Sequence, residues 1–329
     1  VMGRPMATSQ DFVNWVCSED LDHRFLKYVL LAEHDTFLSF ASGTTHQTIY
    51  YPEVKAFHVC RPPVRVQQRI AEVLGAIDDL IENNRRRVEV LEEMARSIYR
   101  EWFVRFRYPG HEVVPLVDSP LGPIPDSWAI TALESIAKVN RRSRTPNQDE
   151  VVRYLDISAL GERTIGELND FSGGDAPGRA RRVVEAGDVV WSMVRPNRRA
   201  HALLIEPGAD WIASTGLAVL SATEVSSTWL FEMVSTPEFS DYLVSQEGGA
   251  AYPAVKPKDF ERAPVVVPIP GVDRAFAERI APVHRLRWSL HQQSAALGSL
   301  RDRLLPRLVT GQIDVSHLDL DALTEVATG

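Results

Sequence analysis

Cationic side chains gather in four short stretches between residues 141 and 258. Arginine is the residue that most often reads a base, through two hydrogen bonds to guanine, and both arginine and lysine bind phosphate groups. The side chains predicted from this chemistry to contact DNA are Arg141, Arg142, Arg144, Arg179, Arg181, Arg182, Arg195, Asn197, Arg198, Arg199, Tyr252, Lys256 and Lys258. Base contacts would read a sequence, whereas phosphate contacts would only position the protein on the duplex.

The stretch 195–199 is the most favourable of the four for DNA contact. It follows an apolar run that is typical of a buried strand, so it is predicted to be a loop on a rigid base. Residues 248–258 are predicted to form a flexible turn in which Lys256 or Lys258 contacts phosphate. The alternative for every stretch is a solvated basic surface without a ligand.

The charge of the chain is unevenly distributed. The net charge of −8 counts against nucleic-acid binding, because DNA-binding domains are often basic overall. Between Lys138 and Ala200, however, twelve basic residues stand against nine acidic ones. A locally basic surface on an acidic protein can still bind a phosphate backbone.

Motifs for catalysis are absent from the sequence. It contains no Gly-rich phosphate loop, no dinucleotide-binding turn and no Asn/Asp-Pro-Pro-aromatic tetrapeptide of adenine methyltransferases. Nine histidines are scattered without metal-ligand spacing, and Glu53 and Lys55 only faintly resemble a nuclease Glu-x-Lys pair. No catalytic residue and no metal site are therefore predicted, and a metal-dependent nuclease is kept as an unlikely alternative.

Residues 64–107 carry the clearest structural pattern, which is a long helix with one apolar stripe. The stripe alternates between spacings of four and three, as in a coiled coil. Asn84 in this stripe would either fix the register or face a water molecule. The positions predicted to pair with another helix or a partner are Ile70, Leu74, Ile77, Ile81, Asn84, Val88, Leu91, Ile98 and Trp102.

A second helix is predicted over residues 272–308, where Pro282 should kink or restart it. Its less regular stripe includes Leu286 and Leu300, and the positions assigned to the pairing interface are Ile280, Leu290, Leu297 and Leu304. Antiparallel pairing of the two helices would bury both stripes. Between them, short β-rich runs such as 188–194 and two helical patterns near 229–234 and 238–246 predict a mixed α+β domain.

Parts of the chain occur twice. Segments between residues 7 and 71 resemble segments between 213 and 281, in the order globular domain, proline exit and long helix. The stretch from Pro123 to about residue 212 has no counterpart before the first copy, so the first domain is expected to be truncated, with self-association as one way to complete it. No run of eighteen apolar residues and no secretory signal occur, and with only Cys17 and Cys60 a cytoplasmic location is predicted.

The order and spacing of several motifs resemble those of specificity subunits of type I restriction-modification systems. The resemblance rests on residues 65–78, 83–85, 91–95 and 99–103 in the first helix. It also rests on the segment 122–128, on the Gly-Asp strand 187–192 and on residues 311–313 near the end. Together these motifs cover nearly the whole chain.

The resemblance implies an α+β protein whose target-recognition domains are joined by two long antiparallel coiled-coil helices. The expected domains are the C-terminal part of a first recognition domain (1–63), a spacer helix (64–108), a second recognition domain (109–271), a second spacer helix (272–311) and an acidic tail (312–329). Each recognition domain would read one half of a split target in double-stranded DNA, with the helices setting the gap.

The same resemblance implies a non-catalytic subunit. Methyltransferase subunits and a restriction (motor-nuclease) subunit would dock on it, and S-adenosylmethionine, Mg and ATP would belong to those partners rather than to this chain. No membrane contact is implied. The alternative is a coiled-coil scaffold that binds no DNA, and salt-dependent binding of one DNA sequence separates the two.

Overall fold

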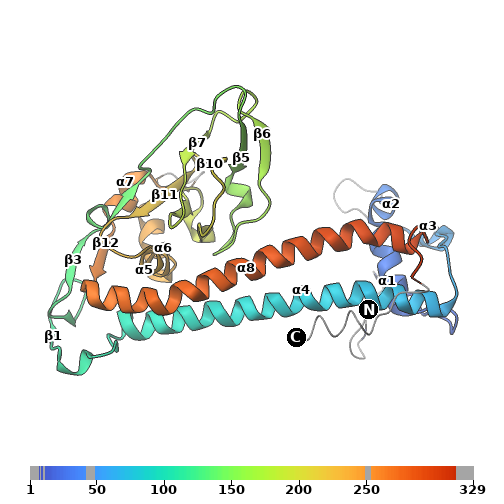
Figure 1. The fold of residues 1–329 in the computed structure, drawn as a ribbon, viewed down its shortest axis with the longest axis horizontal. Helices are drawn as coiled ribbons and strands as arrows, with labels where there is room; N and C mark the ends of the chain where they lie inside the picture. Colours follow the sequence, from blue (N-terminus) through green and yellow to red (C-terminus); the bar gives the residue numbers. More distant parts are fainter. Residues whose placement is uncertain (1–6, 8, 10–11, 42–48, 249–252, 316–329) are drawn as a thin grey trace. The chain divides into compact units, whose positions relative to one another are not determined.

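The structure is a computed structural model that describes residues 7, 9, 12–41, 49–248 and 253–315 (Figure 1). The chain divides into two compact units, which are described separately. Unit 1 comprises Val1–Val88 and Ser289–Gly329, and unit 2 comprises Glu89–Trp288. Helices and mixed sheets both occur, which confirms the predicted α+β class.

Unit 1 is built from short helices on the ends of two long ones. Its elements are α1 (His23–Ala32), α2 (His34–Ser39), α3 (Tyr51–Ala56) and parts of α4 (Val64–Tyr99) and α8 (Pro270–Val309). Asp22 begins α1 because its carboxylate accepts hydrogen bonds from the free N–H groups of Arg24 and Phe25. Phe25 then packs with Leu74 of α4 and Leu308 of α8 in the core of the unit.

Unit 2 holds the strands, and its elements follow one another along the chain between the two long helices. The strands are β1 (Leu116–Val117), β2 (Ile124–Pro125), β3 (Ala129–Ala132), β4 (Ala137–Val139), β5 (Val151–Leu155), β6 (Asn169–Ser172), β7 (Ala180–Val183), β8 (Val189–Ser192), β9 (His201–Leu203), β10 (Trp211–Ser214), β11 (Leu217–Ala222) and β12 (Pro264–Val267). The helices are a π-helix (Arg100–Val104), α5 (Ser227–Val234), α6 (Pro237–Ser245) and α7 (Pro257–Glu261), with short 3-10 turns at His111–Val113, Leu133–Ser135, Ile157–Ala159 and Pro196–Arg198. These bounds confirm the predicted strand near 188–194 and both predicted helical patterns.

Two four-stranded sheets form the body of unit 2, in the strand orders β6-β5-β10-β7 and β4-β11-β8-β9. Only β5 and β10 pair in parallel within them. The strand β8 is buried on both faces: Trp191 faces the core shared with α5, and Val190 faces the core on the other side. This follows from the alternation of side chains along a strand, which requires apolar residues at every position when both faces are covered.

The helices α4 and α8 run antiparallel within each unit, as predicted (Figure 1). In unit 1, Arg301 of α8 bonds Asp78 of α4 at 3.1 Å. In unit 2, Tyr99 and Trp102 contact Phe276 at ring-centroid distances of 6.1 and 5.9 Å. The predicted restart at Pro282 is wrong, because α8 is one continuous helix from Pro270 to Val309.

The positions predicted to line the helix pair are buried or half-buried. Buried are Ile70, Leu74, Ile77, Asn84, Val88, Trp102, Ile280 and Leu290, and half-buried are Ile81, Leu91, Ile98, Leu297 and Leu304. The inclusion of Leu286 and Leu300 in the stripe was wrong, since they are 42% and 39% exposed. His284 and Arg287 are buried instead, so polar groups occupy the middle of the α8 interface.

The repeat seen in the sequence also appears in the order of the helices, because α1 to α4 in unit 1 correspond to α5 to α8 in unit 2. Each copy attaches its first short helix in the same way. The Asp22 N–H donates to Gln67 Oε1 at 2.8 Å, and the Ser226 N–H donates to Asp273 Oδ2 at 2.8 Å. The described residues of unit 1 contain no strand, so the sheets of unit 2 have no counterpart there.

A membrane span requires a helix of about twenty apolar residues. Within the described ranges no helix is both long and apolar enough to cross a membrane.

Candidate nucleic-acid interface

The segment 194–199, here named the arginine loop, leaves the end of β8 in a fixed conformation. The Pro196–Arg198 turn is bracketed by Arg195 and Arg199, whose φ angles of 53° and 52° lie in the left-handed region. Ser240 of α6 donates a hydrogen bond to the Pro196 carbonyl at 3.3 Å. The side chains of Arg195, Asn197 and Arg198 are exposed, so a rigid loop presents three polar groups to a ligand.

The second predicted segment, which contains Lys256 and Lys258, lies directly beside the arginine loop. The Arg195 N–H donates to the Pro253 carbonyl at 2.8 Å, and the Val255 N–H donates to the Met193 carbonyl at 2.9 Å. Both lysines are exposed at the start of α7. Tyr252, the aromatic residue predicted to contact DNA, lies outside the described residues.

The other two predicted stretches also adjoin each other. The Arg144 N–H donates to the Arg181 carbonyl at 2.9 Å, and the Val183 N–H donates to the Arg142 carbonyl at 3.2 Å. Long-range backbone bonds therefore bring residues 141–144 against residues 179–183.

The turn between β10 and β11 connects the two pairs of segments. The Thr215 N–H donates to the Arg179 carbonyl at 2.8 Å, and the Met193 N–H donates to the Gly216 carbonyl at 3.0 Å. All four cationic stretches thus lie side by side in one continuous region of unit 2. Thr215 also lines a shallow hollow with Arg144, Arg181 and Arg182. Thr215 was not among the predicted contacts, because an isolated Thr-Gly pair carries no binding signal.

Several of the predicted cations form ion pairs with neighbouring carboxylates. Glu185 pairs with both Arg141 and Arg142, and Glu150 pairs with Arg144. Arg199 lies 3.2 Å from Glu162 and donates to the Ser235 carbonyl at 2.6 Å. Ion pairing lowers the charge that these four arginines offer to a phosphate group.

The remaining predicted cations have no acidic partner among the described residues. Arg182 donates to Ser143 at 2.9 Å, and burial lowers the pKa of its guanidinium. Arg181 donates to the Gly178 carbonyl at 3.0 Å and to Thr145. The exposed cations whose side chains form no bond within the described part of the chain are named the open cations, and they are Arg179, Arg195, Arg198, Lys256 and Lys258.

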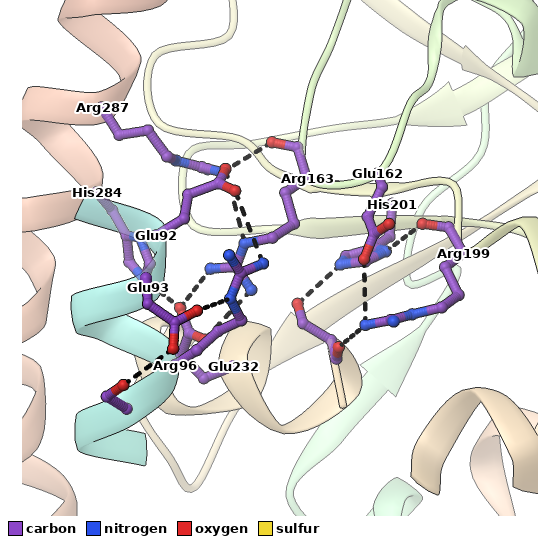
Figure 2. A network of polar contacts seen from close by, with 12 residues as sticks. Glu92, Glu93, Arg96, Glu162, Arg163, Arg199, His201, Glu232, His284 and Arg287 are labelled. Carbon is purple, nitrogen blue, oxygen red and sulfur yellow. Dashed lines mark hydrogen bonds and ion pairs between the residues drawn. The ribbon is translucent and has the colours of Figure 1, made fainter. Parts of the chain in front are cut away.

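A cluster of buried charges in unit 2 is named the buried ion network (Figure 2). It consists of Glu92 on α4, Glu232 on α5, His284 and Arg287 on α8, and Arg163 in the loop between β5 and β6. Arg163 donates to the two Glu232 carboxylate oxygens at 3.2 and 2.5 Å. Arg287 donates to Glu92 Oε1 at 2.9 Å and to the Arg163 carbonyl at 2.8 Å.

The buried ion network is electrically balanced, because two carboxylates face two guanidinium groups. Burial opposes the charge of Glu232, but Arg163 and His284 outweigh this effect and lower the pKa of its carboxyl to about 2. Burial lowers the pKa of His284, although the nearby Glu232 acts in the opposite direction. At neutral pH Glu232 is therefore charged and His284 is neutral.

The residues considered for metal-dependent cleavage lack the geometry for it. Glu53 and Lys55 lie on the helix α3, not on the strand that a nuclease motif requires, and Lys55 stacks over the Tyr51 ring at 4.8 Å. The part of the chain that the structure describes contains no group of three or more His, Cys, Asp and Glu side chains that could hold a metal ion.

Comparison with known proteins shows which family the chain resembles. The family model for the type I restriction modification DNA specificity domain matches residues 2–93. The type I restriction enzyme MjaIX specificity subunit of Methanocaldococcus jannaschii is 23% identical over 322 residues, which are 95% of this chain and 74% of the relative.

Solved structures resemble the chain as well. The S subunit of a type I restriction-modification system from M. genitalium has the same fold, with a TM-score of 0.54 and 15% identity over 88% of this chain and 73% of that one. A chain from structural work on complex assembly and conformational transition of the type I system has 26% identity and a TM-score of 0.44. It matches 60% of this chain, which spans about half (52%) of that longer chain.

Proposed function

We propose that this chain, a relative of type I restriction enzyme specificity subunits, is the DNA-recognition subunit of a type I restriction-modification complex. It performs no chemistry itself. Its role is to bind one or both halves of a bipartite target in double-stranded DNA. The observation that carries the proposal is the gathering of the open cations along one region of unit 2, where backbone hydrogen bonds fix the segments that bear them.

The two parts of this region differ in the contacts that they favour. The arginine loop holds Arg195, Asn197 and Arg198 on a rigid turn, which suits hydrogen bonds to base edges. Arg179, Lys256 and Lys258 are cations without a bonded partner in the described chain, which suits phosphate contacts. Arg141, Arg142 and Arg144 contribute less, because Glu185 and Glu150 offset two of their three positive charges.

The partners of the chain follow from the same proposal. Methyltransferase subunits dock on the long helices, and a restriction subunit joins the assembly. S-adenosylmethionine, Mg and ATP belong to these subunits rather than to this chain. A second copy of the chain is a further candidate partner.

Titration of the full chain with labelled duplex DNA at several salt concentrations tests the proposal. The target is obtained by sequencing the methylated adenines of the host genome. We expect Lys258→Ala to weaken binding of all sequences and to reduce the slope of log K against log salt by about one. Arg195→Ala should instead weaken binding of the target and relax the preference at one base pair, by roughly 1–3 kcal/mol.

Arg153→Ala is the matched control, because Arg153 is an exposed arginine of the same unit that pairs with Asp170 at 3.2 Å. Its affinity should equal that of the parent. If the parent binds no DNA at low salt, the chain is a scaffold. If it binds but both variants behave like the control, the interface lies elsewhere.

A further inference from the structure

We propose that the buried ion network, continued by Glu162 and Arg199, positions the arginine loop relative to α4, α5 and α8. Arg199 then has a positioning role rather than a contact with DNA. The inference rests on the proposed function, because it assigns residues that hold the DNA-reading loop in place.

The first step is the connection between the helices and the loop that carries Arg163. Arg163 bonds Glu232 on α5 and lies 3.8 Å from Glu92 on α4. The carbonyl of Arg163 accepts from Arg287 on α8 at 2.8 Å. Both the side chain and the backbone of this residue are therefore held, and its φ angle of 60° is fixed in the left-handed region. The 160–166 loop cannot rotate without breaking bonds to three helices.

The second step leads from that loop to the arginine loop (Figure 2). Glu162, the neighbour of Arg163, lies 3.2 Å from the Arg199 guanidinium, and the His201 N–H donates to the Gly161 carbonyl at 2.9 Å. Arg199 also donates to the Ser235 carbonyl at the end of α5 at 2.6 Å. The last residue of the arginine loop is thus tied both to the Arg163 loop and to α5.

The third step is the burial of the central charges. The side chains of Arg163 and Glu232 are each 1% exposed, and the Arg163 guanidinium lies 4.4 Å over the Phe231 ring. A buried ion pair adds little stability compared with a well-packed apolar pair, but separating its partners leaves an uncompensated buried charge, so displacement of Arg163 is costly. Its value here is therefore in fixing orientation. Glu162 and Arg199 are more open, at 47% and 28% exposed, so they can be changed without threatening the core.

Hydrogen exchange of the full chain tests the inference without DNA. The amides of Arg198 and Arg199 are held by bonds of 2.9 Å to Arg195 and Pro196. We expect Glu162→Gln and Arg163→Lys to make these two amides exchange about tenfold faster, since a looser loop opens more often. Glu167→Gln is the charge-matched control, because Glu167 is exposed in the same loop region and forms no bond within the described residues.

DNA binding provides the second readout. Removing an acidic group should by itself strengthen DNA binding slightly, and Glu167→Gln should do so without loss of discrimination. Glu162→Gln should instead reduce, by several-fold, the preference for the target over a duplex with one substituted base pair. Glu162→Asp should recover part of it.

The outcomes separate this inference from the proposed function. If the parent binds no DNA, the proposed function fails, whatever the exchange rates are. If the parent binds DNA and the Arg198 and Arg199 amides exchange at the parent rate in both variants, the inference is overturned. Should Arg163→Lys fail to fold, Glu162→Gln and Glu92→Gln decide the question, because each removes only a partly exposed partner.

Discussion

The two copies of the repeat attach a short helix to the long helices with different chemistry at equivalent places. In unit 1, Tyr28 of α1 donates to Asp78 of α4 at 2.8 Å, and Lys27 and Arg301 also bond that carboxylate. In unit 2, the equivalent contact is made by Glu232 of α5 and His284 of α8, which lie 3.2 Å apart.

The two attachment points, named the joints, differ in how far their charged side chains are exposed to solvent. Asp78 and its cations are partly exposed in unit 1, whereas Glu232, Arg163 and His284 are buried in unit 2. An exposed ion pair is weakened by water and salt, and a buried one is strong only while every partner is present. We therefore expect the attachment point to tolerate substitution in unit 1 better than in unit 2, where its charged groups are buried.

The largest difference between the joints should appear when the central acid is removed. We expect Glu232→Leu to lower the free energy of unfolding by about 3–5 kcal/mol, because Arg163 is then a buried charge without its main partner. Asp78→Leu, the equivalent change in unit 1, should cost only about 1 kcal/mol, because its partners Lys27 and Arg301 are partly exposed and water can solvate them when the carboxylate is gone. Urea unfolding of both variants measures the difference. Equal losses would show that burial does not distinguish the joints.

Acid should weaken unit 2 before unit 1. Burial lowers the pKa of His201 to about 3 and also lowers that of His284, so both side chains bind protons more readily in the unfolded chain. Stability is then fully present above the ordinary histidine pKa of 6.5 and falls as the pH drops below it, by about 2 kcal/mol for His201 between pH 6.5 and 5.

Hydrogen exchange of α5 and α1 across this pH range follows the two units separately, after correction for the intrinsic pH dependence of exchange. The α5 amides should lose protection and the α1 amides should not. In the His201→Gln variant, the α5 amides should lose less protection as the pH falls. If their protection depends on pH as steeply as in the parent, His201 does not cause the acid sensitivity.

The smallest expected change in stability concerns the helix N-cap that both copies of the repeat share. Asp22 and Ser226 each cap a short helix and donate their N–H to the first turn of a long one. We expect Asp22→Ala and Ser226→Ala to cost about 1 kcal/mol each, because a lost N-cap leaves helix N–H groups unbonded. Thermal unfolding of both variants provides the comparison. A loss confined to one of them would mean that the two caps are not equivalent.

The long helices and the strand β8 could be predicted because their patterns are local. A spacing of three and four or a short apolar run identifies one element without knowledge of its neighbours. Leu286 was placed wrongly because the buried face of α8 around it contains His284 and Arg287. Burial of such polar groups depends on Glu232 and Glu92, and no apolar pattern within one helix indicates that.

The candidate interface was predictable only in part. The four cationic stretches stand out in the sequence, but the carboxylates that neutralise Arg142 and Arg144 come from Glu185 and Glu150 after folding. Arg163 carried no signal, because its partner Glu232 lies far along the chain. The sequence therefore indicated which side chains bear charge, and the tertiary structure determined which of them remain open.

The left-handed backbone of Arg195 and Arg199 has a consequence for how the protein can change. For a residue other than glycine, such a conformation is unfavourable by about 1 kcal/mol, so each of these arginines lowers the stability of the fold. The substitution Arg195→Gly would remove this conformational strain, but it would also remove a side chain that is proposed to contact DNA. Selection for a sturdier fold and selection for recognition would therefore oppose each other at this position, and a variant that melts later yet discriminates less would reveal that trade-off.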